Sequence, residues 1–346
     1  MVVIMDNTTA NKRIEWIDRA KSFCMFLVIL GHCHIQESYS FVTQFIYSFH
    51  MMLFFFLSGL LCKRDLSYKS LEKDILYIML PYCIYGIIYI IFETIRSHLY
   101  QPENVMAEII SLIIGKDAAI GPIWFLSALF ICKQLFYIIK LLKRRSLILY
   151  YLFVTLSFIP CFFIAKYQLN LPFFADSALC GLPFFILGNE CLFIFSRVDT
   201  LRQRYQLLIS GFFLVGAIVC SCYNGIVSIA DGIIGHSIFL YYLNAIIAIF
   251  SIVIICMLIK NYGLFIRITS YGSIATLGLH SYFLIFFNFY FPKLLGIELG
   301  TYSIYLAIIY SIVTYLGCYV LIIVLDRYCP KLFGLRGLIH KQIKNI

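Results

Sequence analysis

A histidine ends the first apolar run of the chain, in the stretch RIEWIDRAKSFCMFLVILGHCHI from residue 13 to residue 35. Histidine is the side chain best suited to move a proton near neutral pH, so His32 is a candidate general base. Lys21 precedes His32 by about three helical turns, so the two side chains share one helix face and lie about 16 Å apart along the axis. Asp18 lies one turn before Lys21 and could orient or neutralise it. The spacing predicts a polar stripe along one helix.

The composition decides what surrounds this helix. Of the 346 residues, 62% are hydrophobic and only 13% are charged, which leaves too little polar surface for a water-soluble protein. Residues 6–12 are mostly polar, and the first long apolar run has no small-residue cleavage site after it, so we expect this run to be retained as a span. The sequence therefore predicts an integral membrane protein.

Apolar runs of bilayer-spanning length predict an all-α, polytopic helical bundle. We expect about ten transmembrane helices, near residues 22–36, 44–62, 75–95, 121–139, 147–165, 178–195, 206–223, 237–258, 274–291 and 302–325. The bundle forms one domain over residues 1–346, with a cytoplasmic segment at 1–21, the spans within 22–325 and a basic cytoplasmic tail at 326–346.

The basic residues predict the orientation of the bundle. With the N-terminus inside, 22 of the 27 Lys and Arg residues fall on the inner side and four on the outer side, while Lys133 lies within a span. This asymmetry places both termini in the cytoplasm. The net charge of +10 is therefore typical of cytoplasmic loops at a lipid bilayer, and we expect no nucleic-acid partner.

The polar stripe also has structural interpretations, in which neither Lys21 nor His32 takes part in chemistry. Lys21 could be an anchor whose ammonium reaches the inner interface, and His32 could be a hydrogen-bonded histidine at the outer interface. Ionisable side chains inside spans are costly and usually functional, which favours a role in chemistry.

The remaining polar patterns predict less. The 13 cysteines form no CxxC motif and lie mostly in apolar runs, so we expect neither a disulfide framework nor a metal site. The outer segment of residues 97–121 contains EIISLIIG, which could form a short interfacial or re-entrant helix.

Several motifs resemble a known family. The stretch WIDRAKSFCMFLVILGH is similar to the first-helix signature of the membrane acyltransferase-3 family, in particular its fucose-acetylase-like branch of bacterial surface-polysaccharide O-acetyltransferases. FHMMLFFFLSGLLCKR, at residues 49–64, resembles the FHxPLFFFLSG segment of that family. Further similar segments are GPIWFLSALF at 121–130, GLPFFILG at 181–188, YGSIATLGLH at 271–280 and PKLFG near the C-terminus.

This resemblance implies a ten-helix enzyme of the bacterial cytoplasmic membrane. Such an enzyme takes an acyl group, usually acetyl, from cytoplasmic acyl-CoA and transfers it to a hydroxyl of a surface-glycan or lipid-linked sugar. The sugar, the hydroxyl and the choice between acetyl and a larger acyl group stay open. His32 would act as general base, and the donor would present its thioester near His32 while its phosphates stay near the inner basic loops.

Two segments of the second predicted helix match the family. His50 matches the histidine of the FHxPL motif and could pair with His32 or hold the sugar, or it could be an ordinary interface histidine. Ser58 and Gly59 match the SG pair, for which close helix packing through small residues is as good an interpretation as contact with the acyl group.

The donor-binding residues implied by the resemblance are lysines. Lys21 stands where the wider family usually has arginine, so a single-point charge replaces a bidentate contact. Lys73, and less closely Lys69, match an inner-loop position that tends to be arginine in the family. Either could bind donor phosphate or merely reflect the positive-inside bias.

Trp124 and His280 also match family positions, as supporting residues. Trp124 could be a substrate wall or a packing residue, and His280 is an ionisable side chain within a predicted span. His34, Asp231 and His236 fall on the predicted outer side, where they could contact a glycan or be solvated.

The competing function is a transporter or flippase of polysaccharides or glycolipids, because ten helices with intramembrane charges also describe many carriers. Against transport, we find no inverted repeat, and the basic residues are concentrated at one surface.

Overall fold

The computed structural model describes residues 14–33, 40–63, 65–98, 105–115, 118–260, 262–294, 303–337 and 339. Over these residues the fold is all-α, and β pairing is limited to an isolated bridge between Ser228 and Ile233.

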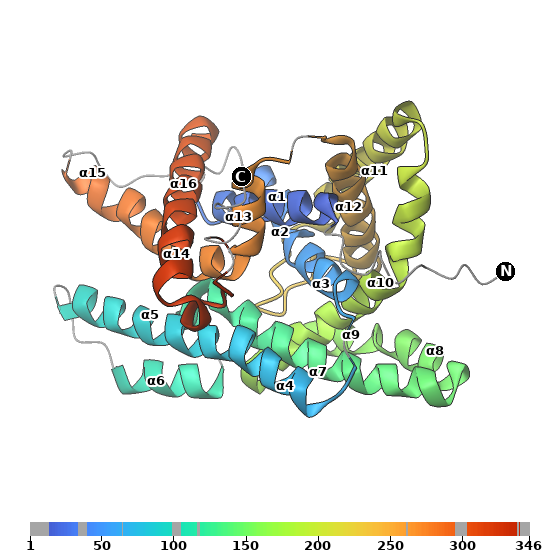
Figure 1. The fold of residues 1–346 in the computed structure, drawn as a ribbon, viewed down its shortest axis with the longest axis horizontal. Coiled ribbons are helices and arrows are strands. Elements are labelled where there is room, and N and C mark those ends of the chain that lie inside the picture. Colours follow the sequence, from blue (N-terminus) through green and yellow to red (C-terminus); the bar gives the residue numbers. More distant parts are fainter. Residues whose placement is uncertain are drawn as a thin grey trace.

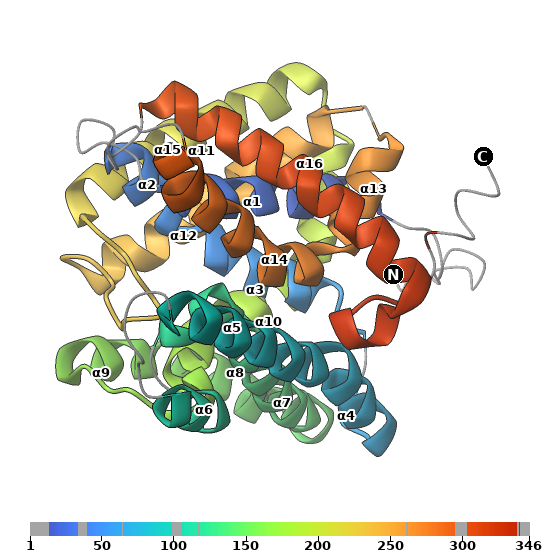
Figure 2. The same cartoon turned by 90° about the vertical axis from the view of Figure 1, so that its left-hand side faces the viewer.

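The helix α1 (Glu15–Gly31) lies in the middle of the group of helices that is uppermost in Figure 1. It contacts α2 (Ser40–Tyr47), α3 (His50–Leu60), α12 (Ile238–Leu258), α13 (Leu264–Tyr271), α14 (Ser273–Ile285) and α16 (Ile304–Tyr328). Figure 2 shows α1 enclosed by these helices. Small or compact side chains such as Ala20, Cys24 and Ile29 are fully buried on it, which allows neighbours on several sides.

A second group of helices lies below α1 and its neighbours in Figure 1. It comprises α4 (Tyr68–Asp74), α5 (Leu80–His98), α6 (Val105–Ile114), α7 (Trp124–Arg145), α8 (Leu147–Leu156) and α9 (Ile159–Tyr167). A π-helical turn, η3 (Ile75–Met79), joins α4 to α5, and a 3₁₀ segment, η4 (Ala118–Ile123), leads into α7. We call the helices around α1 the upper group and those from α4 to α9 the lower group.

The helix α10 (Ala175–Asp199) joins the two groups, because it packs on α3 and on α7. Glycines allow the contact with α3. A Cβ at Gly59 would lie 1.9 Å from the backbone oxygen of Phe185, and one at Gly188 would lie 2.0 Å from that of Phe56. Gly59 therefore has the packing role that small residues have at helix interfaces.

The other elements complete the bundle. They are η5 (Pro172–Phe174), α11 (Gln203–Asn224), which packs along α12, η6 (Phe286–Tyr290), α15 (Phe291–Leu294) and η7 (Pro330–Phe333).

Among the described residues, eight helical segments are long and apolar enough to cross a membrane. They are Ser40–Leu60, Tyr68–Ile95, Gly121–Arg145, Leu147–Tyr167, Pro172–Asp199, Gln203–Asn224, Ile238–Leu258 and Ile304–Tyr328. Each overlaps one predicted span, so these eight of the ten predicted segments are confirmed as helices of spanning length and composition. The predicted span 274–291 overlaps a shorter apolar helix, Ser273–Asn288. The helix expected within residues 97–121 is present as α6.

The predicted boundaries of the first span, 22–36, are wrong. The helix begins at Glu15 and ends at Gly31, so His32 caps it rather than lying inside it. The early start has a physical reason, because charged residues of the first turns bind partners from distant elements. Asp18 accepts hydrogen bonds from Ser270, at 2.6 Å, and from Tyr262, while Arg19 donates to the carbonyl of Cys256 at 2.8 Å.

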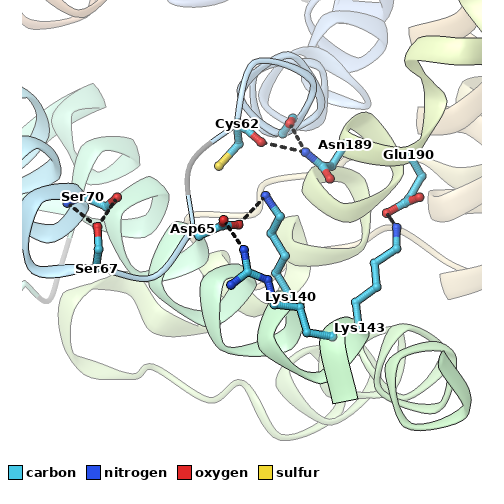
Figure 3. A network of polar contacts seen from close by, with 10 residues as sticks. Cys62, Asp65, Ser67, Ser70, Lys140, Lys143, Asn189 and Glu190 are labelled. Carbon is cyan, nitrogen blue, oxygen red and sulfur yellow. Dashed lines mark hydrogen bonds and ion pairs between the residues drawn. The ribbon is translucent and has the colours of Figure 1, made fainter. Parts of the chain in front are cut away.

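Polar contacts fasten the segment after α3 to the C-terminal end of α7 and to the interior of α10, as Figure 3 shows. Asn189 of α10 donates to the carbonyls of Gly59 and Cys62, at 3.1 and 2.9 Å, which satisfies the end of α3. Asp65 pairs with Lys140 and Arg144, at 2.9 and 2.5 Å. Two segments predicted to be cytoplasmic therefore lie side by side.

Candidate active site

A cavity of about 320 Å³ opens beside the C-terminal end of α1. We call it the histidine cavity. Its lining includes His32, Tyr47, His50, Trp124, Ser228, Asp231, Leu277, Ser281 and Asn288. The upper group contributes through α1, α2, α3 and α14, and the lower group through η4 and α7, so the cavity lies between the two groups.

Three imidazole rings and one phenol meet at this end of α1. The ring centroids of His32 and His280 are 5.3 Å apart, and those of Tyr47 and His50 are 5.1 Å apart. Tyr47 joins the two pairs, because its hydroxyl lies 3.3 Å from Nδ1 of His32. The structure thus brings together His32, His50 and His280, which lie far apart in the sequence.

Glycine at position 31 allows this close approach. A Cβ there would lie 3.0 Å from Cε2 of Tyr47 and 3.3 Å from a side-chain carbon of Ile46, so a larger residue would shift these two side chains of α2 by a few tenths of an ångström. The residue that precedes His32 therefore helps to set the distance between Tyr47 and the imidazole.

Backbone carbonyls orient two of the imidazoles. Nδ1 of His50 lies 2.8 Å from the carbonyl oxygen of Ile46, and Nδ1 of His280 lies 3.0 Å from those of Thr276 and Leu277. A carbonyl can only accept, so Nδ1 carries the proton in both rings and Nε2 is the acceptor in their neutral forms. Among the described residues, the fully buried Nε2 of His280 has no hydrogen-bond partner.

The aromatic wall of the cavity begins at Trp124. Its ring centroid lies 5.9 Å from that of Phe174 and 6.1 Å from that of Phe125, so Trp124 both lines the cavity and packs against buried rings. Asp231, from the segment between α11 and α12, also lines the cavity. His236 lies in the same segment, and His34 lies outside the described residues.

A second cavity, of about 430 Å³, lies near the first turns of α1. We call it the basic cavity. Its lining includes Asp18, Lys21, Ser58, Lys63, Lys73, Asp74, Tyr77, Lys133, Ser270, Tyr271 and Arg336. The lining contains five lysine or arginine residues and two aspartates, so positive charge is in excess.

The two aspartates of the basic cavity are engaged by neighbours. Asp74 accepts from Lys133 at 2.5 Å and from Tyr137 at 3.0 Å, and Asp18 accepts from Ser270. A buried carboxylate held by a lysine and a phenol is compensated within the protein. Five basic against two acidic side chains leave the lining with a net positive charge, which suits an anionic ligand.

The structure separates the predicted donor-binding residues. Lys21 and Lys73 line the basic cavity, as does Ser58, whereas Lys69 lies on the exposed face of α4 and does not line it. Gly59 faces α10 instead.

Sequence reasoning missed Tyr47, Lys133 and Arg336. Tyr47 stands three residues before His50, one helical turn away, but nothing in its type set it apart. Lys133 carried a usable signal, since a lysine within a predicted span is functional by default. Arg336 comes from the tail and reaches the basic cavity only through the tertiary fold, with its guanidinium 5.3 Å from the centroid of the Tyr77 ring.

The same four helices line both cavities. Going from the basic to the histidine cavity, α1 contributes Lys21 and then His32, and α3 contributes Ser58 and then His50. On α7 the pair is Lys133 and Trp124, and on α14 it is Ser273 and Ser281. These separations of 8 to 11 residues correspond to about 12–16 Å of helix, so the cavities lie at two ends of one axis.

Apolar side chains separate the two cavities along this axis. Met25 lies between Lys21 and Val28 on α1, and Phe54 lies between Met51 and Ser58 on α3; both are buried. Phe54 and Phe125 have ring centroids 5.8 Å apart. A ligand that reached from one cavity to the other would have to displace these side chains.

Among the described residues, no group of three or more His, Cys, Asp or Glu side chains is placed to hold a metal ion.

A family model described as an acyltransferase domain matches residues 14–323, which include the whole lining of the histidine cavity and that of the basic cavity except Gly334 and Arg336. No match to the chain was found among curated proteins or among solved structures.

Proposed function

Because the chain belongs to the acyltransferase-3 family, we propose that this multi-pass membrane acyltransferase moves an acetyl group from acetyl-CoA to a hydroxyl of a sugar. The donor enters from the cytoplasm, and the acceptor is a surface-glycan or lipid-linked sugar. We further propose that the enzyme belongs to the fucose-acetylase-like branch and resides in the bacterial cytoplasmic membrane, with both termini inside.

One observation carries the proposal, namely that a basic cavity and a histidine cavity lie on one axis between the same four helices. An acyl-CoA has the same division, since its phosphates are anionic and its thioester lies at the far end of a long, neutral arm. The two cavities therefore match the two ends of the donor.

The basic cavity would hold the phosphates of the donor. Lys21 and Lys73 offer ammonium groups from opposite sides, α1 and α4, and Arg336 offers a guanidinium. Charge-assisted hydrogen bonds to phosphate are among the strong polar contacts in proteins. Lys133 would act indirectly, because its charge is already paired with Asp74.

The arm of the donor fits the distance between the cavities. Lys21 and His32 are about 16 Å apart along α1, and an extended pantetheine arm is on the order of 16–20 Å, comparable to this helical rise. Met25 and Phe54 would turn aside to admit the arm. Methionine suits this role because its side chain is flexible.

His32 would remove the proton from the acceptor hydroxyl. For Nε2 of His32 to be the base, Nδ1 must carry the ring proton and donate a hydrogen bond to the hydroxyl oxygen of Tyr47, 3.3 Å away. The hydroxyl oxygen then attacks the thioester carbonyl, so that a C–O bond forms and the C–S bond breaks. CoA leaves as a thiolate and takes up the proton held by His32.

The other two histidines would support this step. His50 lines the same cavity and offers Nε2 to the sugar, because its Nδ1 is committed to Ile46. His280 lies against His32 and would fix the position of that ring. Trp124 would form a wall for the acceptor.

The experiment uses purified protein in lipid vesicles, with radiolabelled acetyl-CoA outside and de-esterified surface glycan of the producing cells as acceptor. We expect label to enter the glycan as an alkali-labile ester with the wild type and the His236→Gln variant, but not with His32→Gln. His236 is a matched control, because it is an exposed histidine that does not line the histidine cavity. Translocation of glycan without labelling would identify a carrier and refute the proposal.

A further inference from the structure

A third cavity adjoins the histidine cavity. It has a volume of about 270 Å³, and its lining includes Gln168, Asn170, Phe174, Asp176, Ala230 and Asp231. We call it the side compartment. Ala230 and Asp231 line both this compartment and the histidine cavity, so the two spaces meet at these residues. Two other residues connect them as well, because the ring of Phe174 packs against that of Trp124.

We infer that the side compartment binds a second sugar unit of the acceptor, so that the enzyme acts on a disaccharide or longer glycan rather than on a monosaccharide. The inference rests on the proposed function and adds the size of the acceptor to it.

The volumes support one unit in each space. Sites for small molecules usually measure about 300–1,000 Å³, so the histidine cavity alone is at the low end of that range and the side compartment alone is slightly below it. Together they form an elongated site, with the reacting hydroxyl beside His32 and the neighbouring unit beyond Asp231.

The lining of the side compartment suits a sugar. Carboxylates such as Asp176 and Asp231 accept hydrogen bonds from hydroxyl groups, and the amide of Asn170 can both donate and accept. Phe174 is buried and presents an aromatic surface to the apolar face of a sugar ring. The amide nitrogen of Gln168 is already used, because it donates to the carbonyl of Ala165 at 2.8 Å.

The walls of the compartment are fixed before any ligand binds. Ser177, which follows Asp176, is fully buried and donates to the carbonyl of Ile229 at 3.1 Å, so α10 holds the segment that carries Ala230 and Asp231. Asn224 closes the base of that segment, donating to the carbonyl of Ile234 at 2.8 Å and accepting from the backbone of Ser237 at 2.9 Å. A preformed site loses less entropy on binding.

The opposite wall has an unusual backbone. Gln168, Phe173 and Phe174 all have φ between 48° and 58°, the left-handed region that bulky side chains rarely adopt. The surrounding fold therefore holds this wall in a conformation that the chain alone would not choose.

The test compares acceptors that differ only in length. De-esterified surface glycan of the producing cells is partly hydrolysed and separated into monosaccharide, disaccharide and trisaccharide fractions, and each is offered to the purified enzyme with acetyl-CoA. We expect kcat/KM to rise about tenfold from monosaccharide to disaccharide, as expected for a few added hydrogen bonds. The trisaccharide should add little.

Variants locate the effect. Asn170→Ala, an exposed position, should remove most of the gain for the disaccharide while leaving kcat/KM for the monosaccharide unchanged. Asp176→Asn should act in the same direction. Asp199→Asn is the matched control, because it removes one exposed carboxylate from the other end of α10 and should change neither value.

Each contrary result has its own meaning. Equal kcat/KM values for monosaccharide and disaccharide would refute the second subsite and leave the proposed function standing. Loss of the disaccharide preference on adding EDTA would assign the two carboxylates to a cation instead and refute the inference. No transfer to any fraction would refute the proposed function as well.

Discussion

The histidine cavity and the basic cavity share four helices but differ in how their polar groups are held. The basic cavity, of about 430 Å³, carries its charges on long side chains, and its aspartates are compensated by neighbouring side chains. In the histidine cavity, of about 320 Å³, the ring of His50 is held by the backbone carbonyl of Ile46, and the ring of His32 contacts the hydroxyl of Tyr47. Charge alone suffices to hold a flexible anion, whereas proton transfer requires a ring in one orientation. The difference therefore fits binding at one end and chemistry at the other.

The largest effect should follow from His32→Ala. Loss of the base should lower kcat by roughly 10²–10⁴-fold, the usual contribution of positioned acid–base catalysis. The KM for acetyl-CoA should stay near the wild-type value, because the basic cavity is untouched. Steady-state kinetics with both substrates varied measure the two constants. A large rise in the donor KM would break the division between the cavities.

Lys73→Gln should have a smaller effect, on the KM for the donor rather than on kcat. Removal of one phosphate contact should raise the KM for acetyl-CoA about tenfold and leave kcat and the acceptor KM nearly unchanged. Lys69→Gln is the matched control, because Lys69 is an exposed lysine on the same helix that does not line the basic cavity. Equal behaviour of the two variants would assign Lys73 to membrane topology alone.

A substitution in the shared wall should disturb both cavities. Gly59→Ala places a Cβ 1.9 Å from the backbone oxygen of Phe185, so α3 must move away from α10. We expect a loss of stability of about 1–3 kcal/mol, with changes in both kcat and the donor KM. Gly211→Ala on α11 is the control, since nothing lies within 4 Å of the added Cβ. Thermal unfolding in detergent measures the stability, and an unchanged melting temperature for Gly59→Ala would contradict this packing.

The smallest effect should come from Asp65, which lies outside both cavities. Its hydrogen bond with Lys140 lowers the pKa of its carboxyl below the usual 3.8. A carboxyl with a lowered pKa stabilises the fold at pH values above its usual pKa, and this contribution is lost as the pH falls through the lowered value. Asp65→Asn should therefore leave activity and melting temperature unchanged at pH 7, because an exposed ion pair contributes little. A marked loss of either at pH 7 would show that this contact helps to shape the basic cavity.

The elements that could be predicted from the sequence are those set by local pattern. Apolar runs predicted ten spans, because a run of about 20 apolar residues can satisfy its backbone only as a helix in lipid. Eight of these spans are helices of spanning length among the described residues. The spacing of Lys21 and His32 indicated that one helix face connects two polar sites, since helical geometry alone fixes it.

The features that could not be predicted depend on partners far away in the chain. The hydropathy pattern predicted a start of the first helix that is too late. It could not show that the charged side chains of Asp18 and Arg19 form hydrogen bonds with Ser270 and with the carbonyl of Cys256. Nothing local marked Tyr47, whose position follows from the close packing of α2 on α1. The exclusion of Lys69 from the basic cavity likewise depends on how α4 is turned.

The π-helical turn η3 makes the lining of the basic cavity sensitive to the insertion or deletion of one residue. Ile75–Met79 accommodates one residue more than an α-helical turn would, and it lies between Lys73 and the body of α5. Deletion of a single residue here would restore α-helical register. It would rotate α4 by about 100° about the helix axis relative to α5. Lys73 would then leave the basic cavity and a different side chain of α4 would enter it. A single insertion or deletion in η3 would therefore change which side chain of α4 lines the basic cavity, without any substitution among the residues that line it.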